Sequence, residues 1–408
     1  LQQFCLVLLQ LVLITLIVRE FQIEQQRHFL PLLCYIVCGF VIHAWLPLHF
    51  RQTFFAILSA GSLPFMLGAF NGLCVIGICG LCIGVLYLPV RFALRAVLLF
   101  ATVATLVYFR SSVPLPFWPV AGSILMFRLL LFAYEIRHSR KLPPPVTAIS
   151  YFFMLPNACF PFFPVVDYRT FLDSRYRTDE WQIYQRGIVW IVRGLSHLLV
   201  YRVIRTYLVP DINDLQNVKQ IAIFIVTNYA LYLQVSGQFH VITGLLHLFG
   251  FDLPRTHNQF FLAASFSDIW RRINIYWKDF MTKLFFFPAF FMLRRQGASV
   301  VIAVSFSVFW VFLCTWLLHS WQTFWLLGRF PVTANDAWLW LGVGCCVAVN
   351  AVYDSRQRKT PGPITWRSDF SLAVRTVAMF LLVGLFWACW TKPGFLNTVR
   401  TLSASPTF

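Results

Sequence analysis

The sequence is poor in charged residues, and acidic residues are its scarcest charged class. Only 12% of its 408 residues are Asp, Glu, Lys or Arg, and only 15 of them are acidic. Soluble globular proteins carry about 25% charged residues, so this composition excludes an ordinary soluble domain. Alternating segments of about 10 residues, which would indicate a strand-built membrane barrel, are not the pattern either.

Hydrophobic residues make up 59% of the chain, and Phe alone occurs 44 times. About 20 apolar residues span a bilayer as a helix, so we predict an all-α polytopic integral membrane protein. We expect about eleven transmembrane helices, and the short segments 239–250 and 283–293 are expected to be re-entrant or interfacial. The apolar segments lie near 4–18, 30–47, 53–70, 72–90, 94–109, 116–134, 146–164, 187–208, 219–236, 239–250, 283–293, 298–327, 337–353 and 372–391.

The basic residues give a formal net charge of +18. They lie largely in short loops such as 137–141 and 354–359, where the positive-inside rule predicts the cytoplasmic face. No basic arm or stacking platform indicates a nucleic-acid partner. No basic region precedes 4–18, so we expect a first transmembrane helix there rather than a cleavable signal peptide.

A metal centre is not predicted. Most of the eleven Cys lie inside apolar runs, where a free thiol behaves as a small hydrophobe. Cys79 and Cys82 form a single CxxC without the further ligands that zinc requires. His240 and His247 are seven residues apart and share a helical face, but two histidines without a nearby Asp, Glu or Cys make a poor site.

We interpret residues 1–408 as one membrane domain. Residues 1–110 are almost purely apolar helices, the polar motifs fall within 120–330, and 331–408 supplies C-terminal helices. Gly80 and Gly84 have the spacing of a close helix contact. The absence of two matching halves argues against a repeat-built transporter.

The segment "SFSDIWRRINIYWKDF" (265–280) gathers most of the polar chemistry. On a continuous helix Arg271, Asn274 and Lys278 would line one face, and Asp268 would pair with the two arginines. Trp270, Tyr276 and Trp277 add amphipathic rings. The alternative interpretation is an amphipathic interfacial helix whose charges satisfy one another.

His319 is the second feature. It lies in the apolar stretch 298–327 with Thr315, Ser320 and Gln322 as its polar neighbours. Polar groups at membrane depth usually face a bundle interior or a cavity. A neutral imidazole there can act as a general base, and the alternative is a hydrogen-bonded structural histidine.

Five stretches, taken in order, resemble the membrane-bound O-acyltransferase family, nearest the bacterial branch of alginate O-acetyltransferases and teichoic-acid D-alanyl transfer proteins. The strongest, 232–277, keeps a Ser-Gly pair, a Gly-x5-Gly spacing and a Trp-Arg-Arg core, and an apolar helix ending at His319 follows it. The bacterial branch usually has His where this chain has Asn274, and Trp where it has Ile273. The other stretches are "AGSILMFRLLLFAYEI" (121–136), "MLPNACFPFFPVVDYRTF" (154–171) and "GLSHLLVYRVI" (194–204).

The resemblance implies a catalytic core over 120–330 with a central tunnel through the membrane. It implies that His319 activates an acceptor hydroxyl and that Asn274 steadies the oxyanion or positions the donor. Arg271, Arg272 and Lys278 would bind the phosphates of the donor. The tunnel-lining candidates are Trp270, Tyr276, Trp277, Ser236 and Gln238.

The implied reaction moves a short acyl group from a cytoplasmic thioester, acyl-CoA or acyl carrier protein, to a hydroxyl of a glycan or other envelope acceptor. No bound cofactor is expected. The implied location is the bacterial inner membrane, with lipids and a periplasmic acyl-relay protein as partners. The alternatives are a membrane transporter, an inactive family member, or an acyltransferase acting on a lipid or protein.

Overall fold

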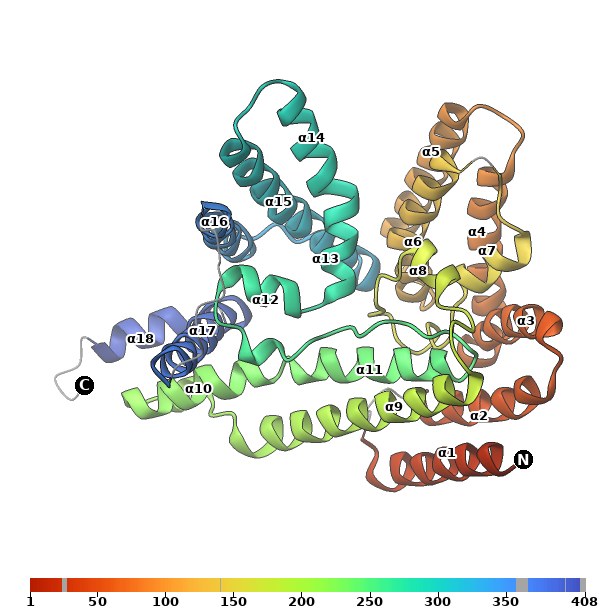
Figure 1. Cartoon of the computed structure of the whole chain (residues 1–408), viewed down its shortest axis with the longest axis horizontal. Coiled ribbons are helices and arrows are strands. Elements are labelled where there is room, and N and C mark those ends of the chain that lie inside the picture. Colours follow the sequence, from red (N-terminus) through yellow and green to blue (C-terminus); the bar gives the residue numbers. More distant parts are fainter. Residues whose placement is uncertain (24–27, 140, 357–365, 393, 404–408) are drawn as a thin grey trace. The chain divides into compact units, whose positions relative to one another are not determined.

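The computed structural model describes residues 1–23, 28–139, 141–356, 366–392 and 394–403. Every regular element in these ranges is a helix (Figure 1). The first part of the chain forms α1 (Gln2–Phe21), α2 (Phe29–Trp45), α3 (Leu48–Leu67), α4 (Ala69–Tyr87), α5 (Phe92–Ser112), α6 (Trp118–His138), α7 (Pro145–Phe152), α8 (Tyr168–Asp173), α9 (Glu180–Val203), η1 (Ile204–Leu208) and η2 (Ile212–Asp214). The rest forms α10 (Val218–Ala230), α11 (Leu233–His247), η3 (Phe260–Leu262), α12 (Phe266–Arg272), α13 (Ile275–Met281), η4 (Thr282–Phe286), α14 (Phe287–Arg295), α15 (Val300–Leu327), α16 (Ala334–Arg356), α17 (Trp366–Thr391) and α18 (Phe395–Ser403).

Nine helical stretches within the described ranges are long and apolar enough to cross a membrane. The prediction of a helical, polytopic membrane protein is therefore confirmed, whereas the number eleven stays a prediction. Parts of the two basic loops, residues 140 and 357–359, lie outside the described residues. The nine stretches are Gln2–Phe21, Ala69–Tyr87, Phe92–Ser112, Trp118–His138, Glu180–Leu208, Val218–His247, Val300–Leu327, Ala334–Asp354 and Asp369–Thr391.

The short segment 239–250 continues an apolar stretch that begins earlier in the chain. Its helical part belongs to α11, which follows α10 after a turn at Leu231 and Tyr232, so that one apolar stretch extends over Val218–His247. The segment 283–293 is helical as well, because α13, η4 and α14 follow one another without a break. The expected re-entrant or interfacial placement of the two segments stays a prediction.

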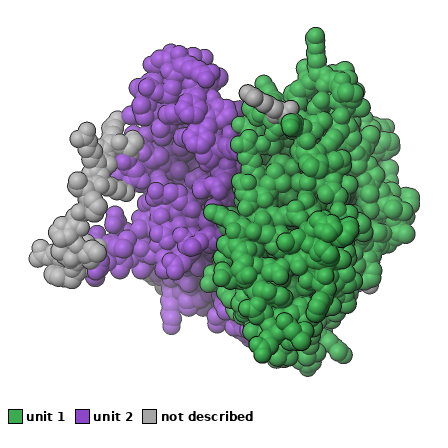
Figure 2. Space-filling model, turned by 45° about the vertical axis from the view of Figure 1, so that its right-hand side comes forward, with its two compact units in different colours: residues 1–196, 237–254, 321–330 green, residues 197–236, 255–320, 331–408 purple. Residues whose placement is uncertain are grey.

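The chain divides into two compact units, each of which contains several non-contiguous segments (Figure 2). Unit 1 comprises residues 1–196, 237–254 and 321–330, and unit 2 comprises 197–236, 255–320 and 331–408. That the chain forms a single membrane domain stays a prediction.

Glycines allow α9 and α11 to pack closely in unit 1, where the two helices run side by side (Figure 1). A Cβ at Gly194 would lie 2.6 Å from the carbonyl oxygen of Gly237, and a Cβ at Gly187 would lie 2.8 Å from that of Gly244. Both helices thus carry a Gly pair at seven-residue spacing, which keeps two glycines on one face. Such small residues let helix backbones approach each other in membrane proteins.

The predicted contact at Gly80 and Gly84 is wrong. A Cβ at either position would have no atom within 4 Å, so these glycines do not mark a helix crossing. The two residues lie on α4, whose buried positions include Val75, Cys79 and Cys82. The four-residue spacing therefore places Gly80 and Gly84 away from the packed face of the helix.

This contrast predicts opposite outcomes for two alanine substitutions. Gly194→Ala should lower stability by about 1–3 kcal/mol, because its Cβ overlaps backbone atoms that cannot move aside. Gly84→Ala should be neutral or stabilising by up to about 1 kcal/mol, because Ala is the better helix former. Thermal unfolding of both purified variants in one detergent measures the difference. Equal melting temperatures would show that the α9–α11 contact is not tight.

A buried arginine organises the Pro-rich segment of unit 1. Arg128 on α6 is 2% exposed, and its guanidinium donates to the carbonyl oxygen of Phe152 at 2.5 Å and to Asn157 Oδ1 at 2.6 Å. Asn157 in turn donates to Ser123 Oγ at 2.7 Å, and the Phe163 ring lies 4.3 Å from the guanidinium carbon. Irregular backbone at membrane depth persists only where protein satisfies its polar groups. Arg128 does so for the Phe152 carbonyl oxygen, and its bond to Asn157 ties the Pro-rich segment to α6.

Unit 2 is built around helix pairs. α10 packs on α17, α12 packs on α16, and α16 packs on α17. A core of Tyr229, Ala263, Ile269 and Met379 lies among these helices. A second core joins Phe224, Cys389 and Phe395 and is covered by Val399 and Leu402 of α18. These contacts fix the elements that carry the predicted site.

Candidate functional site

The polar segment 265–280 forms two helices, α12 and α13, rather than one (Figure 1). α12 begins at Ser265, whose Oγ accepts a hydrogen bond from the Asp268 backbone N–H at 3.1 Å. Asp268 Oδ1 lies 2.9 Å from Arg272 Nε and 3.9 Å from Arg271 Nη2, which confirms the predicted pairing with both arginines. The expected stripe of Arg271, Asn274 and Lys278 along one helix is wrong.

The break occurs at Asn274, which has φ 40° and ψ 65°, in the left-handed region. Asn tolerates this region better than most residues, because its short polar side chain bonds to nearby backbone. Here Asn274 Oδ1 accepts from the Trp277 N–H at 3.3 Å and caps α13. The loop before α12 also bonds to the backbone at the break, since Ile275 N donates to the Thr256 carbonyl oxygen at 2.8 Å.

The same break brings α13 to His319. The indole of Trp277 lies 5.1 Å from the His319 ring, centroid to centroid, and the Trp340 ring stacks on His319 at 4.8 Å with an interplanar angle of 15°. Trp277 is also the residue whose backbone N–H donates to the Asn274 cap. The structure therefore places Trp277, on the helix that Asn274 caps, against His319 in unit 2.

The three predicted donor-binding cations differ in their exposure and in the distance to their acidic partners. Arg271 has a side chain 63% exposed and only the long contact to Asp268 at 3.9 Å. Arg272 is 29% exposed and engages the same carboxylate at 2.9 Å. Lys278 lies 2.7 Å from Asp279 Oδ1. Arg271 is thus the least constrained of the three by the ion pairs of this segment.

The aromatic candidates on α12 and α13 make helix contacts. Trp270 packs on Phe312 of α15 with ring centroids 4.7 Å apart. Tyr276 is 5% exposed, and burial raises the pKa of its phenol well above the ordinary value, so this hydroxyl stays protonated. Both side chains therefore help to fix α12 and α13 in unit 2.

Ser236 and Gln238 are not brought to His319 by any described contact. Ser236 is fully buried, donates to the Leu233 carbonyl oxygen at 3.3 Å and lies 3.0 Å from His197 Nδ1. Gln238 is 6% exposed and belongs to unit 1. The tunnel-lining role of both residues stays a prediction.

His257 is a buried polar residue that the sequence did not single out. It is 5% exposed, its Nδ1 lies 3.1 Å from Thr256 Oγ1, and its Nε2 lies 3.4 Å from the Tyr232 hydroxyl. Burial, with a smaller contribution from His197, lowers the pKa of His257 to about 3, so its imidazole is neutral near pH 7. In the sequence, His257 is marked only by its position next to Asn258 in the loop before α12, which does not indicate that it is buried.

The two histidines considered as metal ligands have other partners. His240 stacks on Trp190 with centroids 4.9 Å apart. His247 Nδ1 lies 2.7 Å from the Thr243 carbonyl oxygen, and its Nε2 lies 3.5 Å from Asp252 Oδ1. In the part of the chain that the structure describes, no group of three His, Cys, Asp or Glu residues could hold a metal ion.

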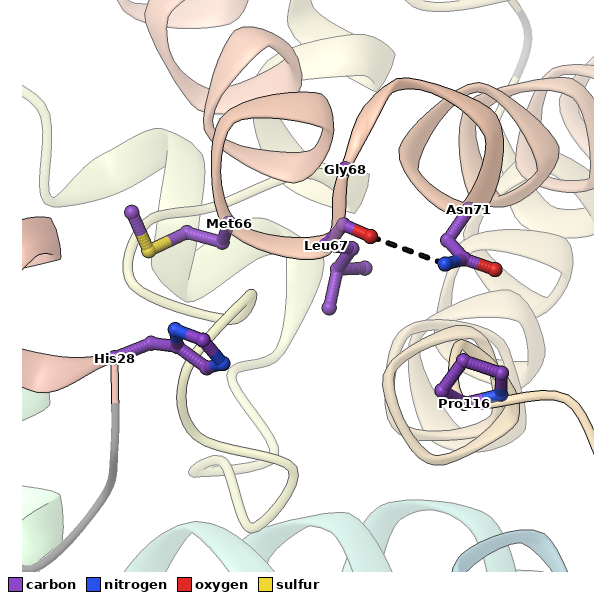
Figure 3. A pocket seen from close by; sticks show the side chains of 6 residues that line it. All are labelled: His28, Met66, Leu67, Gly68, Asn71 and Pro116. Atoms are coloured by element: carbon purple, nitrogen blue, oxygen red, sulfur yellow. Dashed lines mark hydrogen bonds between the residues drawn. The ribbon is translucent and has the colours of Figure 1, made fainter.

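A cavity of about 360 Å³ lies in unit 1, beside the junction of α3 and α4 (Figure 3). The side chain of Asn71 donates to the Leu67 carbonyl oxygen at 3.1 Å across this junction. None of the predicted site residues lines the cavity, and its lining contains no acid–base pair. The lining residues are His28, Met66, Leu67, Gly68, Asn71 and Pro116.

The conformation of Asn274 predicts a graded series of substitutions. Asn274→Asp keeps the cap and should leave stability within about 0.5 kcal/mol. Asn274→Gly keeps the left-handed backbone but loses the cap, whereas Asn274→Ala should cost about 1–2 kcal/mol for the left-handed backbone and about 1 kcal/mol for the lost cap. Thermal unfolding should therefore rank the variants Asp, Gly, Ala. A more stable Ala than Gly variant would contradict the left-handed conformation.

No protein-family model matches the chain, and no curated protein matches it at a significant level. The resemblance to membrane-bound O-acyltransferases therefore depends on the quoted motifs and stays a prediction. The geometry adds one observation of its own, which is the contact of Trp277, on the helix that Asn274 caps, with His319.

Proposed function

We propose that the chain is an integral membrane O-acyltransferase related to the membrane-bound O-acyltransferase family. The observation that carries this proposal is the neighbourhood of His319 and the Asn274–Trp277 turn, two features distant in sequence that the resemblance assigns to one reaction. The substrates are a thioester donor, acyl-CoA or acyl carrier protein, and a hydroxyl of an envelope glycan. The proposed location is the bacterial inner membrane, with a periplasmic acyl-relay protein as a partner.

In the proposed reaction an imidazole nitrogen of His319 takes the proton of the acceptor hydroxyl. The hydroxyl oxygen then forms a bond to the thioester carbonyl carbon, the C–S bond breaks, and the thiolate leaves and takes up the proton. The side-chain amide of Asn274 has two roles in this scheme. Its Oδ1 caps α13, and its NH2 group donates to the developing oxyanion. A donor aimed at new negative charge is worth about 2.7–4 kcal/mol in comparable sites.

The proposal is tested by incubating membranes that contain the protein with radiolabelled acetyl-CoA and then with a longer acyl-CoA. Transfer of label to glycan, lipid or protein identifies the acceptor class, and the His319→Gln variant is the negative control. Mass spectrometry of envelope glycans from a deletion strain gives the same answer in the cell. Absence of label from every acceptor with either donor would favour the alternatives, a transporter or an inactive family member.

Donor binding should depend on Arg271 more than on Arg272. Arg271→Gln removes an exposed cation with a weak partner, so donor affinity should fall by about 10- to 100-fold, the equivalent of one charge-assisted contact of roughly 1.5–3 kcal/mol. Titration of purified protein with a non-hydrolysable acyl-CoA measures it.

Two variants control this experiment. Arg295→Gln removes another exposed cation, on α14, and should bind the donor as wild type does. Arg272→Gln breaks the closer pair with Asp268 and should lower thermal stability. A wild-type affinity for Arg271→Gln would remove Arg271 from the donor site.

A further inference from the structure

The imidazole of His319 is enclosed by two indoles. Trp277 on α13 covers it at 5.1 Å with an angle of 35°, and Trp340 on α16 stacks on it at 4.8 Å with an angle of 15°. Stacked rings restrict rotation of the enclosed side chain, and each such pair contributes about 0.5–1.5 kcal/mol beyond its buried area. Where an indole covers a face of the ring, hydrogen-bond partners approach His319 in the ring plane, where both nitrogens lie.

Trp340 is itself held in place. Its ring contacts Trp390 of α17 at 6.0 Å and 71°, and Trp390 Nε1 donates to Asp336 Oδ1 at 2.7 Å. Asp336 Oδ2 accepts from the Thr333 hydroxyl at 2.5 Å. Asp336 and Trp340 are four residues apart on α16 and therefore share a face.

We propose that Trp340 is a positioning residue, which with Trp277 holds the His319 imidazole in the orientation that proton transfer requires. The carboxylate of Asp336 secures Trp340 through Trp390. This inference depends on the proposed role of His319 as the base. A displacement of about 1 Å in a catalytic group can cost about 100-fold in rate, so a side chain that only orients the imidazole can have a large effect on turnover.

Ordinary core packing is the competing explanation for these contacts. Packing alone predicts that loss of the Trp340 ring lowers stability, with turnover per folded molecule unchanged. Positioning predicts a lower kcat, an unchanged KM for the donor, and a changed environment of the His319 ring nitrogens. The neighbouring Trp338 provides a matched control, because it lies on the same helix, is 55% exposed and contacts Phe386 instead of His319.

The experiment uses the full chain in lipid nanodiscs, labelled with ¹⁵N-histidine, with the His319 ring signals assigned by their loss in His319→Gln. Trp340→Leu should reduce kcat by about 10- to 100-fold, leave the donor KM within about twofold, and shift the ring signals toward averaged tautomers. Trp340→Phe, which keeps a stacking ring, should restore most of both. Trp338→Leu should change neither.

Unchanged ring signals and unchanged kcat in Trp340→Leu would overturn the inference. If Trp340→Leu is too unstable to purify, Trp390→Phe, which keeps an aromatic ring but loses the N–H bond to Asp336 and part of the indole area, takes its place. A shift of the His319 signals in that variant supports the inference, and wild-type signals and kcat overturn it. If the wild-type protein transfers no acyl group at all, the ring signals still decide the positioning role while the proposed function fails separately.

Discussion

His319→Gln is expected to reduce acyl transfer by at least about 100-fold, the lower end of the loss when a general base is removed. Glutamine retains a side chain that hydrogen-bonds, but its amide cannot take up a proton near pH 7. Stability should fall by no more than about 1–3 kcal/mol, since the variant loses a stacked ring contact with Trp340 and a tilted one with Trp277. Initial rates of purified protein, normalised to the folded fraction, measure the effect.

His257→Gln is the matched control for this substitution. It makes the same chemical change in a more deeply buried histidine, which contacts Tyr232 and Thr256 and has no described contact with His319. Its effect should be on melting temperature, with the normalised rate close to wild type. If His319→Gln instead keeps most of its activity, His319 is structural and the general-base mechanism is wrong.

Arg128→Met should give the largest loss of stability among single substitutions in unit 1. Methionine fills much of the same volume, but the Phe152 carbonyl oxygen and Asn157 Oδ1 would each lose a buried donor. An unsatisfied buried acceptor costs about 1–3 kcal/mol. Because the cost of burying the guanidinium disappears at the same time, we expect a net loss of about 2–4 kcal/mol.

Thermal unfolding in detergent measures this loss, with Arg137→Met as the control. Arg137 is an exposed arginine on the same helix, and its substitution should change the melting temperature little. Arg128→Lys should fall between the two, since an ammonium cannot reach both acceptors as a planar guanidinium does. A melting temperature for Arg128→Met equal to that of wild type would show that the Pro-rich segment does not depend on Arg128.

The long spans were predictable because length and apolar composition suffice to recognise them, as α5 and α15 illustrate. The break between α12 and α13 was not predictable from the spacing of Arg271, Asn274 and Lys278, because helical periodicity carries no information about one residue in the left-handed region. The bond from Ile275 to the Thr256 carbonyl oxygen, which helps to hold the break, also joins distant positions.

The candidate site was predictable in part for a similar reason. His319 stood out because an imidazole in an apolar run is costly unless it has partners. Trp277 was a tunnel-lining candidate, but its contact with His319 was not predicted, and Trp340 did not stand out. Indoles are common throughout this chain, and their ring contacts form only when α13, α15 and α16 pack. The close contact of α9 and α11 had a sequence signal, which is the seven-residue spacing of two glycines on each helix. The four-residue spacing of Gly80 and Gly84 was chosen instead, and it marks no contact.

The left-handed backbone at position 274 also limits which residues evolution can place there. Beside glycine, that region favours Asn, Asp and His among the common amino acids. The codons of Asn and His differ by one base. An exchange of Asn274 for His would therefore preserve the turn before α13 while it changed the chemistry of the side chain.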